Sequence, residues 1–202
     1  MIRKIALIHP PYISNIKSVP LGLAYISAFL KKHGYAVQLI DMDPMGMGIE
    51  RLKNKLIQFC PDVVGISFMT LQAEQAHKIA SEVKEISNKI VTVAGGIHAS
   101  SLPKDTLLNS DFDFVVVGEG EETFREMLEF LNKGENSYSS IKGLAFKKDG
   151  QIQINERRKL IANVDLLPFP DRSNLPIHKY TNSILGKEDN SPVFSILSTR
   201  GC

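Results

Sequence analysis

The sequence predicts an α/β protein with a doubly wound, five-stranded parallel sheet, followed by a β-hairpin and an extended linker. Five short apolar runs recur over residues 1–133, and stretches with helical apolar spacing lie between them. The runs are nearly all apolar and are bounded by Gly, Pro, Asp or His, as is typical of strands buried on both faces of a parallel sheet. Alternating strands and helices favour right-handed crossovers, in a flavodoxin-like or Rossmann-like arrangement.

The elements follow in order along residues 1–133. A first helix is expected between Pro20, which suits a first helical turn, and Gly34, which follows the last turn. Apolar residues at helical spacing predict further helices near residues 49–59, 76–87 and 124–131. The five predicted strands are Lys4–Ile8, Ala36–Ile40, Val63–Ile66, Ile90–Ala94 and Phe114–Val117.

The pattern changes after residue 133. Apolar runs at 141–147 and 151–155 flank Asp149-Gly150, which is a strong hairpin signal. The proline-containing stretch 156–190 lacks periodicity and is predicted to be an extended linker, and the run 193–197 predicts one more strand. The expected organisation is an α/β domain over 1–133, a hairpin and linker over 134–192, and the first strand of a further domain over 193–202.

Composition excludes several classes of protein. Hydrophobic residues make up 43% and charged residues 23% of the chain, which argues against dominant disorder. A net charge of +2 argues against broad capture of nucleic acid. No apolar run reaches the roughly 18 residues of a membrane span. The only cysteines, Cys60 and Cys202, cannot form a disulfide framework, so a cytoplasmic location is expected.

Residues that follow the strands form the candidate site, because ligands of such sheets bind beyond the carboxyl ends of the strands. The loop after the first strand has no glycine-rich dinucleotide or phosphate motif. Its consecutive prolines, Pro10 and Pro11, make either a rigid turn or a wall against a large ligand. Asp41, at the end of the second strand, is more consistent with a solvated strand end than with a ribose ligand.

The third and fourth strands run into polar and glycine residues. Ser67 and Thr70 offer hydroxyls that could cap the next helix or contact a ligand. Gly95 and Gly96 remove side chains where a ligand could approach the backbone, although glycine pairs are also common in turns. His98 is either a ligand contact or an ordinary loop residue.

The fifth strand is followed by Gly118 and Gly120, which flank Glu119 before a helix. Backbone amides at that helix start could meet a polar ligand group, but the neighbouring glutamates disfavour phosphate and suit a neutral edge or a ribose better. Cys60 lies on the apolar face of the second predicted helix and is expected in the core.

Several segments carry a more specific signal together than any of them does alone. They are His9-Pro10-Pro11, Pro20–Tyr25, Val64–Ser67, Ala94–Ala99 and Val117–Thr123, and in this order they resemble the cobalamin-binding domain of radical S-adenosylmethionine enzymes. The linker segment Leu167–Arg172 looks like the stretch before the catalytic barrel of that family. The end of the chain, Ser198–Cys202, looks like the start of the family's C-x-x-x-C-x-x-C cluster motif.

This resemblance implies a flavodoxin-like cobalamin-binding domain. The corrin would lie over the carboxyl ends of the strands, and its nucleotide tail would enter a cleft between sheet and helices. Gly95 and Gly96 would let the tail pass close to the backbone, and Ser67 would be its hydrogen-bond partner. The other candidate cofactor contacts are Pro10, Pro11, Tyr12, Leu21, Gly22, Met69, Thr70, His98, Gly118, Glu119 and Gly120.

One departure concerns the lower axial ligand of cobalt. The chain lacks the D-x-H-x-x-G motif that supplies an axial histidine in many cobalamin proteins, and His9-Pro10-Pro11 stands there instead. The resemblance therefore implies base-off binding without a protein histidine ligand.

The resemblance also implies the chemistry of a larger enzyme. Cys202 would be the first ligand of a four-iron, four-sulfur cluster that cleaves S-adenosylmethionine, in the full-length enzyme only, and the chain ends before the other two cysteines. A radical S-adenosylmethionine barrel would be the missing partner. Methylcobalamin would give a methyl group to a small-molecule substrate radical, or related radical chemistry would occur, and the chain is not expected to be active alone. The alternative is a non-catalytic flavodoxin-like module that holds a nucleotide or flavin or senses cobalamin.

Overall fold

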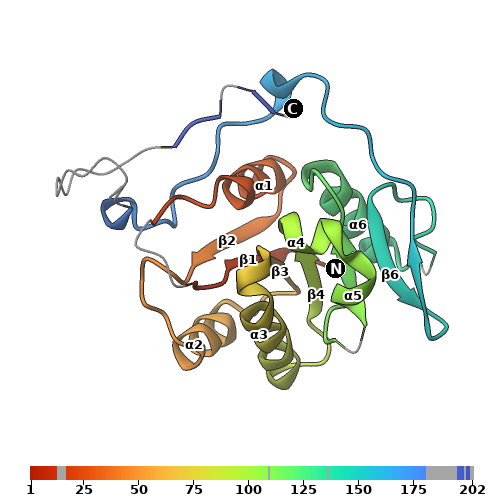
Figure 1. Cartoon of the computed structure of the whole chain (residues 1–202), viewed down its shortest axis with the longest axis horizontal. Helices are drawn as coiled ribbons and strands as arrows, with labels where there is room; N and C mark the ends of the chain where they lie inside the picture. Colours follow the sequence, from red (N-terminus) through yellow and green to blue (C-terminus); the bar gives the residue numbers. More distant parts are fainter. Residues whose placement is uncertain (13–16, 109, 136, 181–194, 198, 201–202) are drawn as a thin grey trace.

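The computed structural model describes residues 1–12, 17–108, 110–135, 137–180, 195–197 and 199–200 (Figure 1). Its centre is a seven-stranded sheet in the order β2-β1-β3-β4-β5-β6-β7. The strands are β1 (Lys4–His9), β2 (Ala36–Asp41), β3 (Val63–Ser67), β4 (Val91–Gly95), β5 (Phe114–Val116), β6 (Leu144–Lys148) and β7 (Gln151–Ile154).

The first five strands are parallel and have the order 2-1-3-4-5. This is the flavodoxin-like version of the predicted doubly wound sheet, and its strand order reverses between β1 and β3. The helices of these units are α1 (Leu21–Lys32), α2 (Ile49–Phe59), α3 (Ala73–Ile86), α4 (Gly96–Ser101), α5 (Pro103–Leu107) and α6 (Glu121–Lys133). Short 3-10 turns occur at η1 (Thr70–Gln72), η2 (Val164–Leu166) and η3 (Ile177–Lys179).

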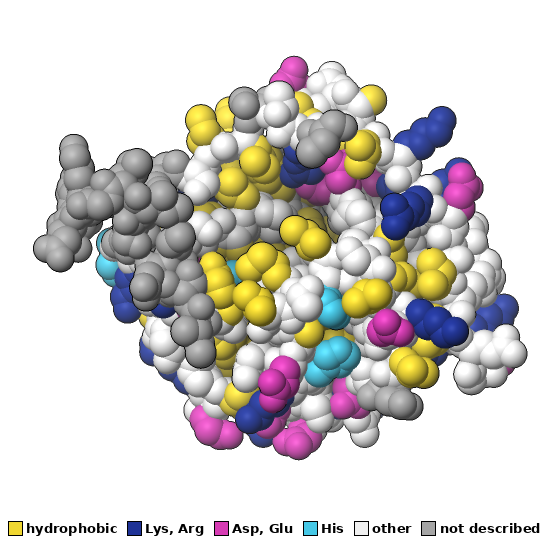
Figure 2. Space-filling view, in the orientation of Figure 1, with side chains coloured by type: hydrophobic (Ala, Val, Ile, Leu, Met, Phe, Trp, Pro, Cys, Tyr) yellow, Lys and Arg dark blue, Asp and Glu magenta, His cyan; other side chains and the backbone are white. Residues whose placement is uncertain are grey.

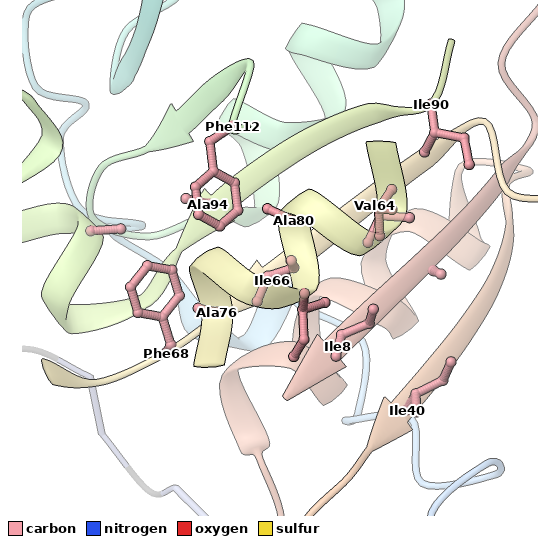
Figure 3. Packing of buried hydrophobic residues seen from close by; sticks show 14 of the residues in the cluster. Ile8, Ile40, Val64, Ile66, Phe68, Ala76, Ala80, Ile90, Ala94 and Phe112 are labelled. Carbon is pink, nitrogen blue, oxygen red and sulfur yellow. The ribbon is translucent and has the colours of Figure 1, made fainter. Parts of the chain in front are cut away.

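Two hydrophobic clusters lie on opposite faces of the sheet, because successive strand residues point to opposite faces. Ile5 and Leu7 of β1 pack toward α1 and α6, which lie above the sheet in Figure 1. Ile8 packs with the cluster beneath α2 and α3. Figure 3 shows this second cluster, in which Ile66 and Ala80 meet between the sheet and α3.

The predicted hairpin extends the same sheet. β6 pairs antiparallel with β5, and β7 pairs antiparallel with β6. Asp149 and Gly150 have φ values of 50° and 76°, the left-handed backbone that a tight two-residue hairpin turn requires. Phe146 of β6 lies against Phe114 of β5, with 6.4 Å between ring centroids. The five parallel strands therefore continue directly into two antiparallel strands.

The linker after β7 returns to the first helix (Figure 1). Asp171 accepts hydrogen bonds from Ser27 Oγ at 2.6 Å and forms an ion pair with Lys31 Nζ at 2.7 Å, and its own amide donates to the Ala24 carbonyl. Further along, Tyr180 is 1% exposed. The predicted linker thus contacts α1 through Asp171 and buries Tyr180 in the α/β domain.

Two expectations need correction. Cys60 is exposed, not buried, and its φ of 52° ends α2. The cause is Pro61, which disfavours the helical conformation of the residue before it, so Cys60 leaves the apolar face of the helix. The strand predicted over 193–197 lies partly outside the described residues, and its described part, 195–197, is not a strand.

Among the described residues, no helix combines the length and the apolar composition that crossing a bilayer requires.

Candidate functional site

A hollow of about 510 Å³ opens where β3, β4 and β5 end. Small residues dominate its wall, and they come from the elements that follow these strands and from the start of α1. They are Gly22, Ser67, Gly96, Ser100, Ser101, Gly118 and Gly120, and the larger Glu119 lies among them. Figure 2 shows apolar side chains gathered on the face of the molecule that Figure 1 presents. Within the hollow, the apolar side chains are those of Ile26, Ile97, Leu160 and Leu197.

Glycines leave the backbone along this rim uncovered by side chains. A Cβ atom added at Gly22, Gly95 or Gly118 would meet no heavy atom within 4 Å. Gly96 and Gly118 both have a left-handed backbone, with φ values of +90° and +85°, but only at Gly96 would an added Cβ also clash, 2.6 Å from the Phe68 carbonyl oxygen. Glycine at 96 is therefore required by the fold, whereas glycine at 95 leaves space that a ligand can use.

A narrow pocket continues from the rim into the space between the sheet and helices α1 and α6. It has a volume of about 50 Å³, and Leu23, Gly65, Ser67, Gly95 and Phe124 contribute to its wall. Such a volume holds roughly three or four water molecules. Gly65 packs closely under this wall, since an added Cβ would lie 2.9 Å from Leu7 Cδ2. Entry of a planar base would require the side chains of the α1 and α6 wall to move.

A buried polar network lies behind the loop that follows β1. His9 Nδ1 lies 3.0 Å from Asp41 Oδ1, and Gln72 Nε2 lies 3.1 Å from His9 Nε2. Because a carboxylate only accepts hydrogen bonds, Nδ1 carries the proton, and Nε2 accepts from the amide. Gln72 Nε2 also donates to the Pro10 carbonyl at 2.6 Å. Both ring nitrogens of His9 are thus engaged within the domain, which leaves neither free for a metal.

Asp41 also forms a hydrogen bond with the linker. The Tyr180 hydroxyl donates to Asp41 Oδ2 at 2.9 Å, and both residues are buried. Burial and the nearby carboxylate raise the pKa of Tyr180 well above its ordinary value of 10.0. The interpretation of Asp41 as a solvated strand end is therefore wrong. Asp41 is 4% exposed, because its carboxylate joins β1, β2 and the linker.

The predicted site residues fall into two groups. Those that line the hollow or the narrow pocket are Gly22, Ser67, Gly95, Gly96, Gly118, Glu119 and Gly120. Those that line neither cavity are Pro10, Pro11, Tyr12, Leu21, Met69, Thr70 and His98. In this second group, His98 Nδ1 lies 3.1 Å from Thr70 Oγ1, and the His98 ring packs against Phe68 at 5.5 Å. The cofactor roles of both groups stay predictions.

Eight residues of the hollow were not predicted from the sequence as site residues: Ile26, Ile97, Ser100, Ser101, Glu121, Leu160, Leu197 and Arg200. Ile26 carries the spacing of a core helix residue, and Leu160 and Arg200 come from segments without regular structure. Leu160, Leu197 and Arg200 carry no local signal, because only the tertiary fold brings them to the rim. Cys202, the predicted cluster ligand, lies outside the described residues. The described residues contain no group of three His, Cys, Asp or Glu side chains arranged to hold a metal ion.

A doubly wound sheet with a glycine-lined hollow over its carboxyl edge defines an α/β ligand-binding domain of the flavodoxin-like type. Residues 16–128 match the family model of the B12 binding domain. The match covers more than half of the chain, and the chain belongs to the B12 binding domain family. The cobalamin-binding resemblance of the sequence is thereby confirmed.

Two curated relatives are methyltransferases. The chain is 34% identical over 208 residues to an uncharacterized methyltransferase from Pyrococcus horikoshii, an alignment that covers 100% of this chain and 44% of the relative. It is 34% identical over 228 residues to cytidylyl-2-hydroxyethylphosphonate methyltransferase from Streptomyces wedmorensis, covering 91% of this chain and 42% of the relative. The chain therefore spans less than half the length of these relatives.

A solved structure shares the fold. It is the cobalamin-dependent S-adenosylmethionine radical enzyme OxsB with aqua-cobalamin and S-adenosylmethionine bound. The TM-score is 0.75 at 22% identity, over 89% of this chain and 25% of that chain.

Proposed function

We propose that this chain is the cobalamin-binding module of a radical S-adenosylmethionine enzyme, and that the corrin binds over the glycine-lined hollow. The bare backbone at Gly95 and Gly118 is the observation that carries this proposal, because it leaves room at the strand ends for a bulky cofactor. Membership of the B12 binding domain family supports the choice of cobalamin over other cofactors.

The residues of the hollow suit a large, mostly apolar macrocycle with polar edges. Ile97, Leu160 and Leu197 offer exposed apolar contacts, and the Ser67 hydroxyl and backbone amides along the rim offer hydrogen bonds. Cobalamin, when bound, supplies an alkyl–cobalt bond whose methyl group can be transferred. The role of this chain is to hold the cofactor and shield one face of it from water.

The narrow pocket marks where the nucleotide tail would enter. It begins at Ser67 and Gly95 and runs beneath α1 and α6. Its present volume of about 50 Å³ is smaller than a nucleotide base, so the tail would displace Ile26 and Phe124 as it enters. His9 is not proposed as an axial ligand, because Asp41 and Gln72 engage both of its ring nitrogens.

The activity of the whole enzyme belongs to the same proposal. We infer that a radical S-adenosylmethionine barrel completes it, with Cys202 as the first thiolate ligand of a four-iron, four-sulfur cluster. The reaction is methyl transfer to a small-molecule substrate radical, or a related radical reaction, in a reducing cytoplasmic setting. The 202-residue chain by itself holds the cofactor and does not catalyse the reaction.

Cofactor retention tests the module. The purified chain is mixed with hydroxocobalamin, desalted and measured by visible absorption, and we expect corrin absorbance to stay with the protein. Gly95→Val should weaken binding by about tenfold or more, the equivalent of roughly 1.4 kcal/mol, because its side chain projects into open space at the rim. The fold should survive the same change.

Gly48→Val is the matched control. A Cβ at Gly48 also meets nothing within 4 Å, and Gly48 precedes α2, away from both cavities. Equal affinity of the Gly95→Val and wild-type proteins would refute the placement of the cofactor and its nucleotide tail at this rim. Retention of a flavin, or of no cofactor at all, would refute the cobalamin module itself.

A further inference from the structure

Arg200 lies at the lip of the hollow and binds the start of α6. Its Nη1 donates to Glu121 Oε1 at 2.6 Å, and Glu119 Oε1 lies 3.8 Å from the same nitrogen. Its guanidinium carbon lies 4.5 Å from the centre of the Tyr25 ring. The Arg200 side chain is therefore held by α1 and α6 at once, although 79 residues separate it from Glu121.

The contact with Arg200 matters for stability because the Glu121 carboxylate is buried. Its side chain is 3% exposed, and within the described part of the chain no other cation lies within ion-pair distance of its carboxylate. The first turn of α6 favours a negative charge there. Even so, an unpaired buried carboxylate is strongly destabilising, so the domain depends on Arg200 to keep Glu121 in place.

Arg200 also stands between two cavities. It lines the hollow at the rim, and it lines a second cavity of about 240 Å³ that Tyr25, Leu167 and Phe169 border. Leu197 lines both cavities as well. Leu197 and Arg200 thus lie between the hollow of the proposed corrin site and the cavity that the linker borders. Cys202 follows Arg200 by two residues in the sequence.

We propose that Arg200 is a positioning residue that latches the segment leading to the candidate cluster cysteine onto the rim of the cobalamin hollow. The role of this latch rests on the proposed function, since the latch would fix where the cluster-binding segment meets the corrin. Arginine suits the task because its planar guanidinium can hydrogen-bond a carboxylate and stack on a ring at the same time. Lysine could replace only the first of these contacts.

Backbone dynamics of the terminal segment test the latch. In the wild-type chain, the ¹⁵N heteronuclear NOE values of Leu197, Thr199 and Arg200 should match those of α6. Arg200→Ala should lower the values of Leu197 and Thr199 well below those of α6, and Arg200→Lys should give intermediate values. Arg125→Ala is the matched control, because Arg125 pairs with Glu122 and Glu129 on α6 and lines neither cavity.

A double-mutant cycle separates the ion pair from a general loss of packing. Arg200→Ala should lower the denaturation midpoint, because it leaves Glu121 buried and unpaired. Adding Glu121→Gln should restore much of that loss, whereas two independent packing defects would lower the midpoint further. Low NOE values in the wild type, values unchanged by Arg200→Ala, or additive midpoint losses would each overturn the latch.

A cofactor-retention measurement shows whether the cobalamin module or the latch has failed. If the wild-type chain fails to retain hydroxocobalamin, the cobalamin module fails, while the NOE values and the mutant cycle still decide the latch. If the chain retains the corrin and Arg200→Ala leaves the terminal amides unchanged, the latch is refuted and the module stands.

Discussion

At the residue scale, the adjacent glycines of the rim have different physical reasons to be glycine. Gly96 adopts a φ of +90°, and an added Cβ would press on the backbone nitrogen and oxygen of Phe68. Gly95 has neither constraint. The pair looks uniform in the sequence, but only the second glycine is required by the backbone of the domain itself.

Gly96→Ala should therefore destabilise the domain, in contrast to Gly95→Ala. We expect a loss of about 2 kcal/mol or more for Gly96→Ala, from the left-handed backbone and the close contacts at Phe68. Gly95→Ala should change the free energy of unfolding by less than about 0.5 kcal/mol. Urea unfolding followed by circular dichroism measures both, and equal losses would contradict the distinction.

At the scale of elements, the linker is joined to α1 by a charged contact. Burial alone would raise the pKa of Asp171, but hydrogen bonds from Lys31, Ser27 and Ser173 together hold it well below its ordinary value of 3.8. The folded state therefore favours the ionised carboxylate. The contact contributes stability at every pH above 3.8.

This contact should weaken in acid. As the pH falls below 3.8, the unfolded state takes up the Asp171 proton before the folded state does, so the free energy of unfolding falls. Asp171→Asn should lower stability at pH 7 and flatten the acid limb of the curve of stability against pH. Urea midpoints between pH 2 and pH 7 measure this, at low and at high salt, since salt screens the Lys31 partner. An identical acid limb in both proteins would argue against the ion pair.

At the scale of the whole molecule, the core extends past the five parallel strands. Ile141, Leu144 and Phe146 are buried against the cluster that includes α1 and α6, and Leu175 and Tyr180 join the same cluster. Residues far apart in the chain thus complete the hydrophobic cluster on this face of the sheet. The expected domain boundary at residue 133 stays a prediction that truncation can test.

Chains ending at residue 133 and at residue 180 should behave differently. The shorter chain leaves the edge of β5 uncovered and removes five large side chains from the core. Ile141, Leu144, Phe146 and Leu175 alone account for a loss of about 9 kcal/mol, at roughly 1.5–3 kcal/mol each. We expect the chain 1–180 to unfold cooperatively and the chain 1–133 to lose its sharp thermal transition and to bind a hydrophobic dye. A sharp transition for 1–133 near that of 1–180 would show that the five parallel strands suffice.

The sequence was enough to predict the elements that depend on local pattern. The five apolar runs became β1 to β5 with ends shifted by at most one residue, because burial on both faces leaves a continuous apolar signal. The hairpin followed from Asp149-Gly150, whose left-handed backbone is a local requirement. The glycines after β4 and β5 reached one rim, because parallel strands end at the same edge of a sheet.

The tertiary structure decided what no local pattern encodes. The sequence by itself determined the doubly wound fold, the position of the hollow and the family. Only the folded chain paired Asp41 with His9 and Tyr180 and brought Arg200 to Glu121. The physical reason is that such contacts join residues tens of positions apart, so their charges and hydrogen bonds find partners only after the core has formed.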